Sequence, residues 1–296
     1  MTPSRCATEP GTSMSAEFRE RRLTAQDGLS LYYRDYGDPL SPRLPLLCLT
    51  GLTRNSADYA DLAERHASER RVLCPDYRGR GRSDHDRDWR NYEARIYVRD
   101  ITHLIAANDL QRIVVVGTSL GGILAMALGV LKPTVLAGVV INDIGPDVAG
   151  GGFSRILSYI GTDQPQPDWE SAVRYLRRLL PGVNIATDEG WLRMARATYR
   201  AGPDGLLHFD WDVNLAKPLR AARAVPDLWP YFRALRRVPT LVLRGEKSDV
   251  LSRDTFDRMA LAKPDLLRVT VPGAGHTPTL NEPEAAAAID AFIRRF

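Results

Sequence analysis

Short apolar runs alternate with longer amphipathic stretches along most of the chain. The apolar runs rich in Val, Leu and Ile are predicted to be strands, at 45–51, 71–76, 113–116, 135–141, 240–243 and 267–271. Residues 18–38 add two strands joined by a turn at Asp27-Gly28. Helical spacing separates most of these runs, as at 57–70 and 92–108. Continuous apolar strands that alternate with helices indicate a mostly parallel sheet covered on both faces.

The alternation stops between about 145 and 237. This region contains several prolines and amphipathic helical patterns such as 169–180, but no convincing strand pattern. We therefore expect a helical unit inserted between two parts of one α/β core, at 17–144 and 238–296. Residues 1–16 lack the apolar stretch of a signal peptide and are predicted to be a disordered lead. Translation starts at Met1 and at Met14 both fit this pattern.

Composition narrows the class of protein. The chain has 296 residues, of which 44% are hydrophobic and 26% charged, an ordinary balance for one large core. Lys and Arg exceed Asp and Glu by 40 to 36, and the arginine groups lie beside apolar sequence, so we expect solvated faces rather than a nucleic-acid surface. No uninterrupted apolar stretch is long enough to predict a membrane span.

The cysteines indicate neither a disulfide framework nor a metal site. Cys48 and Cys74 lie inside apolar runs, and Cys6 lies in the predicted lead. The odd number of cysteines, without a C-x-x-C pair or histidines at metal-binding spacing, favours the reducing conditions of the cytoplasm. We therefore expect no bound metal.

The candidate nucleophile is Ser119, in the sequence Gly117-Thr118-Ser119-Leu120-Gly121. This G-x-S-x-G pattern lies between a predicted strand and a predicted helix, where a tight turn exposes the serine hydroxyl. Because the helix begins there, its free N–H groups face developing negative charge, and we expect the N–H of Leu120 to donate to an oxyanion. The chain lacks the lysine of a P-loop and a G-x-G-x-x-G after the first strand, so no nucleotide cofactor is expected.

A serine nucleophile needs a base, and the base needs an acid to orient it. Of the five histidines, only His276 follows a late strand among small residues. Two aspartates compete as the acid: Asp249 follows the strand at 240–243, and Asp143 ends the strand before the insertion. We expect Asp249 to orient His276, with Asp143 as the alternative, because both strand tips lie at the same edge of the sheet.

With these residues in place, the chain resembles the α/β-hydrolase superfamily over about residues 17–296, in particular small bacterial enol-lactonases, carboxylesterases and carbon–carbon bond hydrolases. The landmarks that match are Leu49-Thr50-Gly51-Leu52, the segment 76–83, the turn at Ser119, the segment 244–249 and Gly273-Ala274-Gly275-His276. The resemblance implies the α/β-hydrolase fold, an eight-stranded and mostly parallel sheet with a helical cap at 145–237. It also implies Leu52 N–H as the second oxyanion donor, although Thr50 replaces a histidine common in the family.

The resemblance further implies that the cap supplies the substrate pocket. Candidate contacts are Trp191, Tyr199, Trp211 and Trp229, with Arg193, Arg196 and Arg200 as candidate anion contacts. The alternative for each aromatic is packing within the cap. We expect a serine hydrolase that cleaves a small ester or lactone through an acyl-enzyme. A carbon–carbon bond hydrolase acting on a ketone, a perhydrolase with the same triad and a non-catalytic ligand-binding receptor stay open, as do a monomer and a homodimer.

Overall fold

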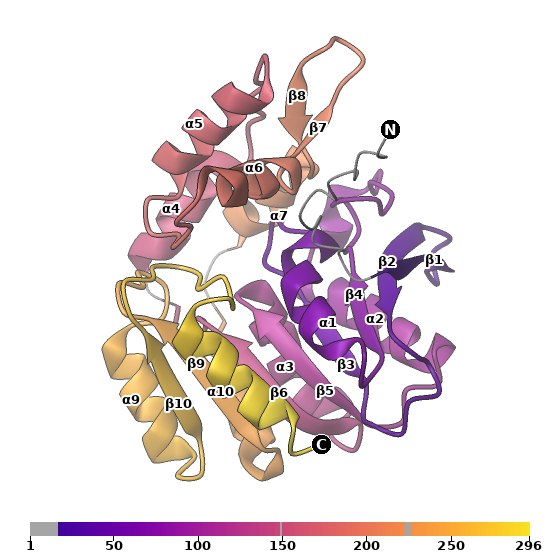
Figure 1. The fold of residues 1–296 in the computed structure, drawn as a ribbon, viewed down its shortest axis with the longest axis vertical. Coiled ribbons are helices and arrows are strands. Elements are labelled where there is room, and N and C mark those ends of the chain that lie inside the picture. The colour runs from indigo at the N-terminus through magenta and orange to yellow at the C-terminus, as the bar shows by residue number, and fades with distance from the viewer. Residues whose placement is uncertain (1–16, 149, 223–225) are drawn as a thin grey trace, which may run out of the picture.

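An eight-stranded sheet forms the centre of the molecule (Figure 1). The structure, a computed structural model, describes residues 17–148, 150–222 and 226–296, so the predicted lead at 1–16 lies outside the described residues. The strands of the sheet are β1 (Phe18–Thr24), β2 (Ser30–Tyr36), β3 (Leu46–Leu49), β4 (Val72–Pro75), β5 (Ile113–Thr118), β6 (Leu136–Asn142), β9 (Thr240–Gly245) and β10 (Leu267–Val271). Their order is β1-β2-β4-β3-β5-β6-β9-β10, and only the pairs that include β2 are antiparallel. The predicted α/β-hydrolase fold is confirmed.

Helices cover both faces of the sheet. Those packed on one face are α1 (Ala60–His66) and α10 (Pro283–Ile293), and those on the other are α2 (Ala94–Ala107), α3 (Leu120–Leu131), α8 (Trp229–Ala234) and α9 (Arg253–Ala262). Along β5, Val114 and Val116 pack toward the first face, whereas Ile113 and Val115 pack toward the second. This alternation with a period of two explains why the central strands are apolar at nearly every position.

The cap lies over one edge of the sheet (Figure 1). Its elements are α4 (Gly150–Ile160), α5 (Trp169–Leu179), α6 (Asp188–Arg196), β7 (Tyr199–Ala201), β8 (Leu207–Phe209) and α7 (Ala216–Ala221). The antiparallel hairpin formed by β7 and β8 is an addition to the predicted helical cap. These strands are three residues long, too short for an alternating pattern to be seen in the sequence. A turn that places Gly205 at φ 81° closes the hairpin.

The end of the inserted region packs on the core. Helix α8 lies against α3, and Gly129 of α3 is so close to Leu235 that an added Cβ would lie 2.6 Å from its side chain. Residues 229–237, which we expected to be part of the cap, therefore contact the core helices directly. Short 3-10 helices complete the fold at Ser56–Tyr59, Trp89–Asn91, Val213–Leu215 and Leu235–Arg237. Within the described residues, every helix is too short or too polar to cross a membrane.

Candidate active site

Ser119 stands on a sharp bend between β5 and α3. Its backbone has φ 51° and ψ −113°, a conformation that non-glycine residues rarely adopt. The bend brings neighbouring backbones into close contact. A Cβ on Gly117 would lie 2.4 Å from the carbonyl oxygen of Gly121, and a Cβ on Gly121 would lie 1.9 Å from that of Leu49. Both flanking glycines are therefore required by the turn that presents the serine hydroxyl.

His276 lies beside this serine on the loop that follows β10. Its Nε2 is 3.0 Å from Ser119 Oγ. The loop is fixed from the cap side, because Gly275 N–H donates to the carbonyl of Gly182 at 2.7 Å. The two backbones approach so closely that a Cβ on Gly275 would lie 2.9 Å from Gly182 Cα. Small residues before the histidine thus let its loop pass between the sheet edge and the cap.

Asp143 orients the histidine. Its side chain is fully buried, and Oδ2 lies 2.7 Å from His276 Nδ1. The carboxylate also accepts hydrogen bonds from Gly245 N–H at 2.7 Å and from Ser248 Oγ at 2.6 Å. Because a carboxylate only accepts hydrogen bonds, Nδ1 carries the imidazole proton and Nε2 is left to accept from the hydroxyl of Ser119. Such a row can move a proton from the serine as its oxygen attacks a substrate.

The structure corrects the preference for Asp249 as the residue that orients His276. The Asp249 side chain is 42% exposed and accepts two hydrogen bonds from Arg155 of α4, at 2.8 and 3.0 Å. These bonds hold the pKa of Asp249 below its usual range. The carboxylate is turned toward the cap because a charged partner is available there, while the alternative, Asp143, occupies the position beside the histidine.

A buried polar network, which was not predicted from the sequence, supports Ser119 and His276. Asn142 Nδ2 donates to Thr118 Oγ1 at 3.2 Å and to the carbonyl of Pro278 at 2.9 Å, so it ties the tip of β5 to the histidine loop. The hydroxyl of Tyr59 lies 3.0 Å from Thr118 Oγ1, and burial raises the pKa of this phenol. A polar residue at the end of a wholly apolar strand, as at Asn142, is the signal that could have revealed this network.

The two expected oxyanion donors come from separate elements. Leu120 is the first residue of α3, where a backbone N–H has no acceptor within the helix. Leu52 lies on the loop after β3, and its carbonyl accepts a 2.7 Å hydrogen bond from the fully buried Arg80. Thr50, at the position of the usual histidine, donates its hydroxyl to the carbonyl of Arg54 at 3.2 Å. This loop is thus bonded internally and to the core.

Comparison with known proteins shows the family to which the chain belongs. A family model described as the alpha/beta hydrolase family matches residues 46–289. The chain belongs to the alpha/beta hydrolase family. It is a hydrolase of the alpha/beta type.

Relatives of this alpha/beta hydrolase span nearly its whole length. The 3-hydroxybutyrate-oligomer hydrolase of Cupriavidus necator is 34% identical over 274 residues, which are 88% of this chain and 92% of the relative. The 2-(acetamidomethylene)succinate hydrolase of Mesorhizobium japonicum is 30% identical over 250 residues, which are 84% of this chain and 87% of the relative. A crystal structure of an alpha/beta hydrolase from Novosphingobium aromaticivorans is 43% identical, covers 95% and 99% of the two chains, and superposes with a TM-score of 0.89.

In this alpha/beta hydrolase, Ser119 and His276 open into a cavity of about 400 Å³ under the cap. Its apolar lining comes largely from the cap: Ile156, Tyr159, Leu176, Leu179, Leu180, Val183, Ile185, Met194 and Trp211. Arg54 and Arg193 also line it. Arg54 forms an ion pair with Asp58 and donates a 2.5 Å hydrogen bond to the hydroxyl of Thr198. The cavity is therefore mainly apolar, and Ser119 and His276 lie together at its core side. Binding sites for small molecules commonly combine an apolar lining with a few polar groups in this way.

The four aromatic residues expected in the pocket have different positions. Trp211 lines the cavity at Ser119 and His276, which is called the catalytic cavity below because it holds the candidate catalytic residues. Tyr199 lines a second cavity instead. Trp191 and Trp229 are buried, and their indole N–H groups are bonded to other parts of the protein. These two residues lie outside the lining of the catalytic cavity. Among the residues that the structure describes, no group of three His, Cys, Asp or Glu side chains is arranged to hold a metal ion.

Proposed function

We propose that this alpha/beta hydrolase is a serine hydrolase that cleaves carboxylic esters or lactones through an acyl-enzyme on Ser119. The observation that carries the proposal is the row of hydrogen bonds from Asp143 through His276 to Ser119, at 2.7 and 3.0 Å, at the wall of the catalytic cavity. Serine is a weak nucleophile alone, and such a row supplies the base and the orientation that it needs.

In the proposed first step, Ser119 Oγ attacks the acyl carbon while its proton passes to His276 Nε2. The negative charge on the carbonyl oxygen rests on the N–H groups of Leu52 and Leu120. His276 then gives the proton to the leaving alcohol oxygen as the carbon–oxygen bond breaks. Asp143 keeps the imidazole in one tautomer and stabilises its positive charge throughout.

The second step releases the acid. Water attacks the acyl carbon of the ester on Ser119, and His276 accepts a proton from that water. The bond to the serine oxygen breaks, and the proton returns to Ser119 Oγ. The products are the carboxylic acid and the free enzyme, so atoms and charges balance without a cofactor.

The proposed substrate class is short esters of hydroxy acids. One relative is a 3-hydroxybutyrate-oligomer hydrolase, and such oligomers are linear esters. The catalytic cavity of about 400 Å³ falls in the size range of small-molecule sites, and its cap side is mostly apolar. These two features support a small, weakly polar acyl chain rather than a long lipid.

The test is an activity screen with a matched pair of variants. The purified chain is assayed on p-nitrophenyl esters of graded length, lactones, the linear dimer and trimer of 3-hydroxybutyrate, and a ketone that would release its fragments only by carbon–carbon cleavage. We expect ester hydrolysis, with a fall of about 10⁵-fold or more in kcat for Ser119→Ala. Ser158→Ala, on the surface of α4, is the control and should keep full activity.

Three outcomes would overturn the proposal. The first is full ester hydrolysis by a folded Ser119→Ala variant. The second is cleavage of the ketone with no activity on any ester or lactone, which would favour a carbon–carbon bond hydrolase. The third is one round of acylation without turnover, which would favour a ligand-binding protein on the same fold.

A further inference from the structure

Arg80 is a buried cation beside the loop that carries the second expected oxyanion donor. Its side chain is fully buried, and its Nε donates to the carbonyl of Leu52 at 2.7 Å. Its Nη1 donates to the carbonyl of Arg78 at 2.7 Å and to the hydroxyl of Tyr97 at 2.9 Å, whereas Nη2 has no acceptor among the described residues. None of the proposed chemical steps involves this side chain.

The positive charge of Arg80 is not neutralised by a carboxylate. Within the part of the chain that the structure describes, its three hydrogen bonds all go to carbonyl or hydroxyl oxygens. The guanidinium lies 4.6 Å from the ring centre of Tyr97 and 5.6 Å from that of Tyr77. Burial of a charge without an opposite charge nearby is costly, and contacts with rings offset only part of that cost. Stability of the fold alone therefore does not account for a guanidinium at this position.

The N–H of Leu52 is free to donate to an oxyanion. Leu52 lines the catalytic cavity, and its N–H makes no hydrogen bond within the described residues. Its neighbour Thr50 is held separately, because the Thr50 carbonyl accepts from Gly121 N–H at 3.0 Å and from the Tyr77 hydroxyl at 3.2 Å. Among the described residues, Arg80 is the only hydrogen-bond donor to the carbonyl of Leu52. Without that bond, Leu52 is held only through its neighbours.

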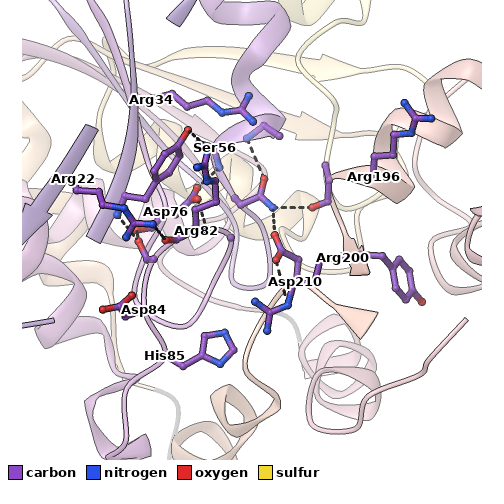
Figure 2. A pocket seen from close by; sticks show the side chains of 17 residues that line it. Arg22, Arg34, Ser56, Asp76, Arg82, Asp84, His85, Arg196, Arg200 and Asp210 are labelled. Atoms are coloured by element: carbon purple, nitrogen blue, oxygen red, sulfur yellow. Dashed lines mark hydrogen bonds and ion pairs between the residues drawn. The ribbon is translucent and has the colours of Figure 1, made fainter. Parts of the chain in front are cut away.

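The backbone of Arg80 is fixed by the cap. Arg80 and Trp211 form an antiparallel β-bridge, and hydrogen bonds to the carbonyl of Asp210, at 3.0 Å, and from the N–H of Asp212, at 2.8 Å, flank it. Figure 2 shows Asp210 at this junction, where its carboxylate also accepts a 2.9 Å hydrogen bond from Asn55 of the loop after β3. The side chain of Arg80 thus reaches the loop from a backbone that the cap holds in place.

We propose that Arg80 is a positioning residue of the oxyanion hole, which holds the Leu52 peptide so that its N–H donates to the oxyanion formed during ester cleavage. The inference rests on the proposed acyl-enzyme mechanism. A hydrogen bond from a charged donor is stronger than one between neutral groups, so the guanidinium holds this peptide firmly. Because an oxyanion hole depends on donors that are placed before the reaction, a shift of Leu52 slows the chemical step more than it weakens substrate binding.

The first measurement compares Arg80→Met with Arg80→Gln in steady-state ester hydrolysis. Methionine fills a similar length of side chain without a donor, whereas glutamine has an amide nitrogen as many bonds from the backbone as arginine Nε. We expect Arg80→Met to lower kcat by about 30-fold with KM within about twofold, less than the loss of an oxyanion donor itself. Arg80→Gln restores a neutral donor and should lower kcat by only about fivefold.

The second measurement compares inhibition by a trifluoromethyl ketone and by the methyl ketone of the same shape. The carbonyl carbon of the trifluoromethyl ketone bonds to Ser119 Oγ, the serine proton passes to His276, and the carbonyl oxygen becomes an oxyanion. The methyl ketone occupies the cavity largely without forming this bond. We expect Arg80→Met to weaken inhibition by the trifluoromethyl ketone by about 30-fold and inhibition by the methyl ketone by less than twofold.

A matched control and a second variant keep the test specific. Arg82→Met changes an exposed arginine of the same segment, which pairs with Glu20, and should behave like the unchanged chain. Circular dichroism and Tm show which variants fold. If Arg80→Met does not fold, Arg80→Gln carries the test, because it should weaken the trifluoromethyl ketone by about fivefold and leave the methyl ketone unchanged.

Three results would overturn the role of Arg80. These are a folded Arg80→Met variant with kcat within about threefold of the unchanged chain, equal losses of kcat in Arg80→Met and Arg80→Gln, and equal weakening of the two ketones. Each of these can occur while Ser119→Ala abolishes ester hydrolysis, so the proposed function would stand. Ester hydrolysis that survives in Ser119→Ala would instead overturn the proposed function, and the role of Arg80 with it.

Discussion

Strands β6 and β9 lie side by side and end at the same edge of the sheet, and an aspartate follows each of them. The carboxylate after β6, Asp143, is fully buried and accepts hydrogen bonds from a backbone N–H, a serine hydroxyl and the imidazole of His276. The carboxylate after β9, Asp249, is 42% exposed and is bound by Arg155. Two residues of the same type at neighbouring strand tips thus have opposite surroundings.

The position of the aspartate within its loop, and not the strand that precedes it, therefore decides which carboxylate reaches His276. Asp143 comes directly after the last residue of β6, so its side chain starts at the sheet edge beneath the histidine loop. The tip of β9 contributes donors instead: Gly245 N–H and Ser248 Oγ both bind Asp143. Asp249 lies farther along that loop, within reach of the cap helix α4. The loop after β9 therefore holds the carboxylate of Asp143, which follows the neighbouring strand β6.

The largest expected effect comes from Asp143→Asn. The amide keeps the shape of the side chain but offers a donor where the imidazole N–H needs an acceptor, so His276 loses the tautomer that accepts from Ser119. We expect kcat for ester hydrolysis to fall by about 10⁴-fold with little change in KM. Steady-state kinetics on the best p-nitrophenyl ester provides the measurement. If Asp143→Asn kept more than a tenth of the activity while folded, the comparison between the two strand tips would be wrong.

A smaller effect is expected from Ser248→Ala. The hydroxyl donates to Asp143 Oδ2 and accepts from the N–H groups of Val250 and Leu251, so its removal loosens the carboxylate and the loop together. We expect kcat to fall by about tenfold, since a hydrogen bond to a charged group is lost. Ser248→Thr keeps the hydroxyl and should restore most of the rate. Equal losses in both variants would show that packing, rather than the hydrogen bond, matters at this position.

The sequence predicted the parts of the site whose signals are local. The bend at Ser119 follows from two glycines within five residues, and the position of His276 follows from a late strand with small residues after it. The preference for Asp249 over Asp143 was wrong, because the sequence does not show that Arg155, which the fold brings from another element, binds the Asp249 carboxylate. Arg80 and Asn142 were missed for the same reason: their contacts join segments far apart in the chain.

The elements of the fold also differ in how much of their pattern is visible in the local sequence. The strands β3, β4, β5, β6 and β9 were predicted because parallel strands covered on both faces are apolar at nearly every position, whereas β1 and β2 were predicted together with the turn at Asp27-Gly28 between them. The hairpin of β7 and β8 was not, since three-residue strands carry too little pattern. Of the four cap aromatics, only Trp211 lines the catalytic cavity, because a helix sequence shows an apolar face without showing whether that face meets a cavity or another helix.

The smallest expected effect comes from Asp249→Asn. The variant loses the ion pair with Arg155, which is partly exposed and so contributes little free energy. We expect kcat to stay within about threefold of the unchanged chain, and Arg155→Gln to behave in the same way. Both variants are assayed beside Asp143→Asn on the same ester. A loss at Asp249 as large as the loss at Asp143 would mean that the acid comes from the β9 loop.

The most direct test of the account is the rate at which a fluorophosphonate labels the protein, followed by intact mass and peptide mapping. We expect one adduct on Ser119 in the unchanged chain, the same rate within about threefold in Asp249→Asn, and labelling slower by about 10³-fold or more in Asp143→Asn. An adduct on any other residue would contradict the account. So would fast labelling of Asp143→Asn together with slow labelling of Asp249→Asn.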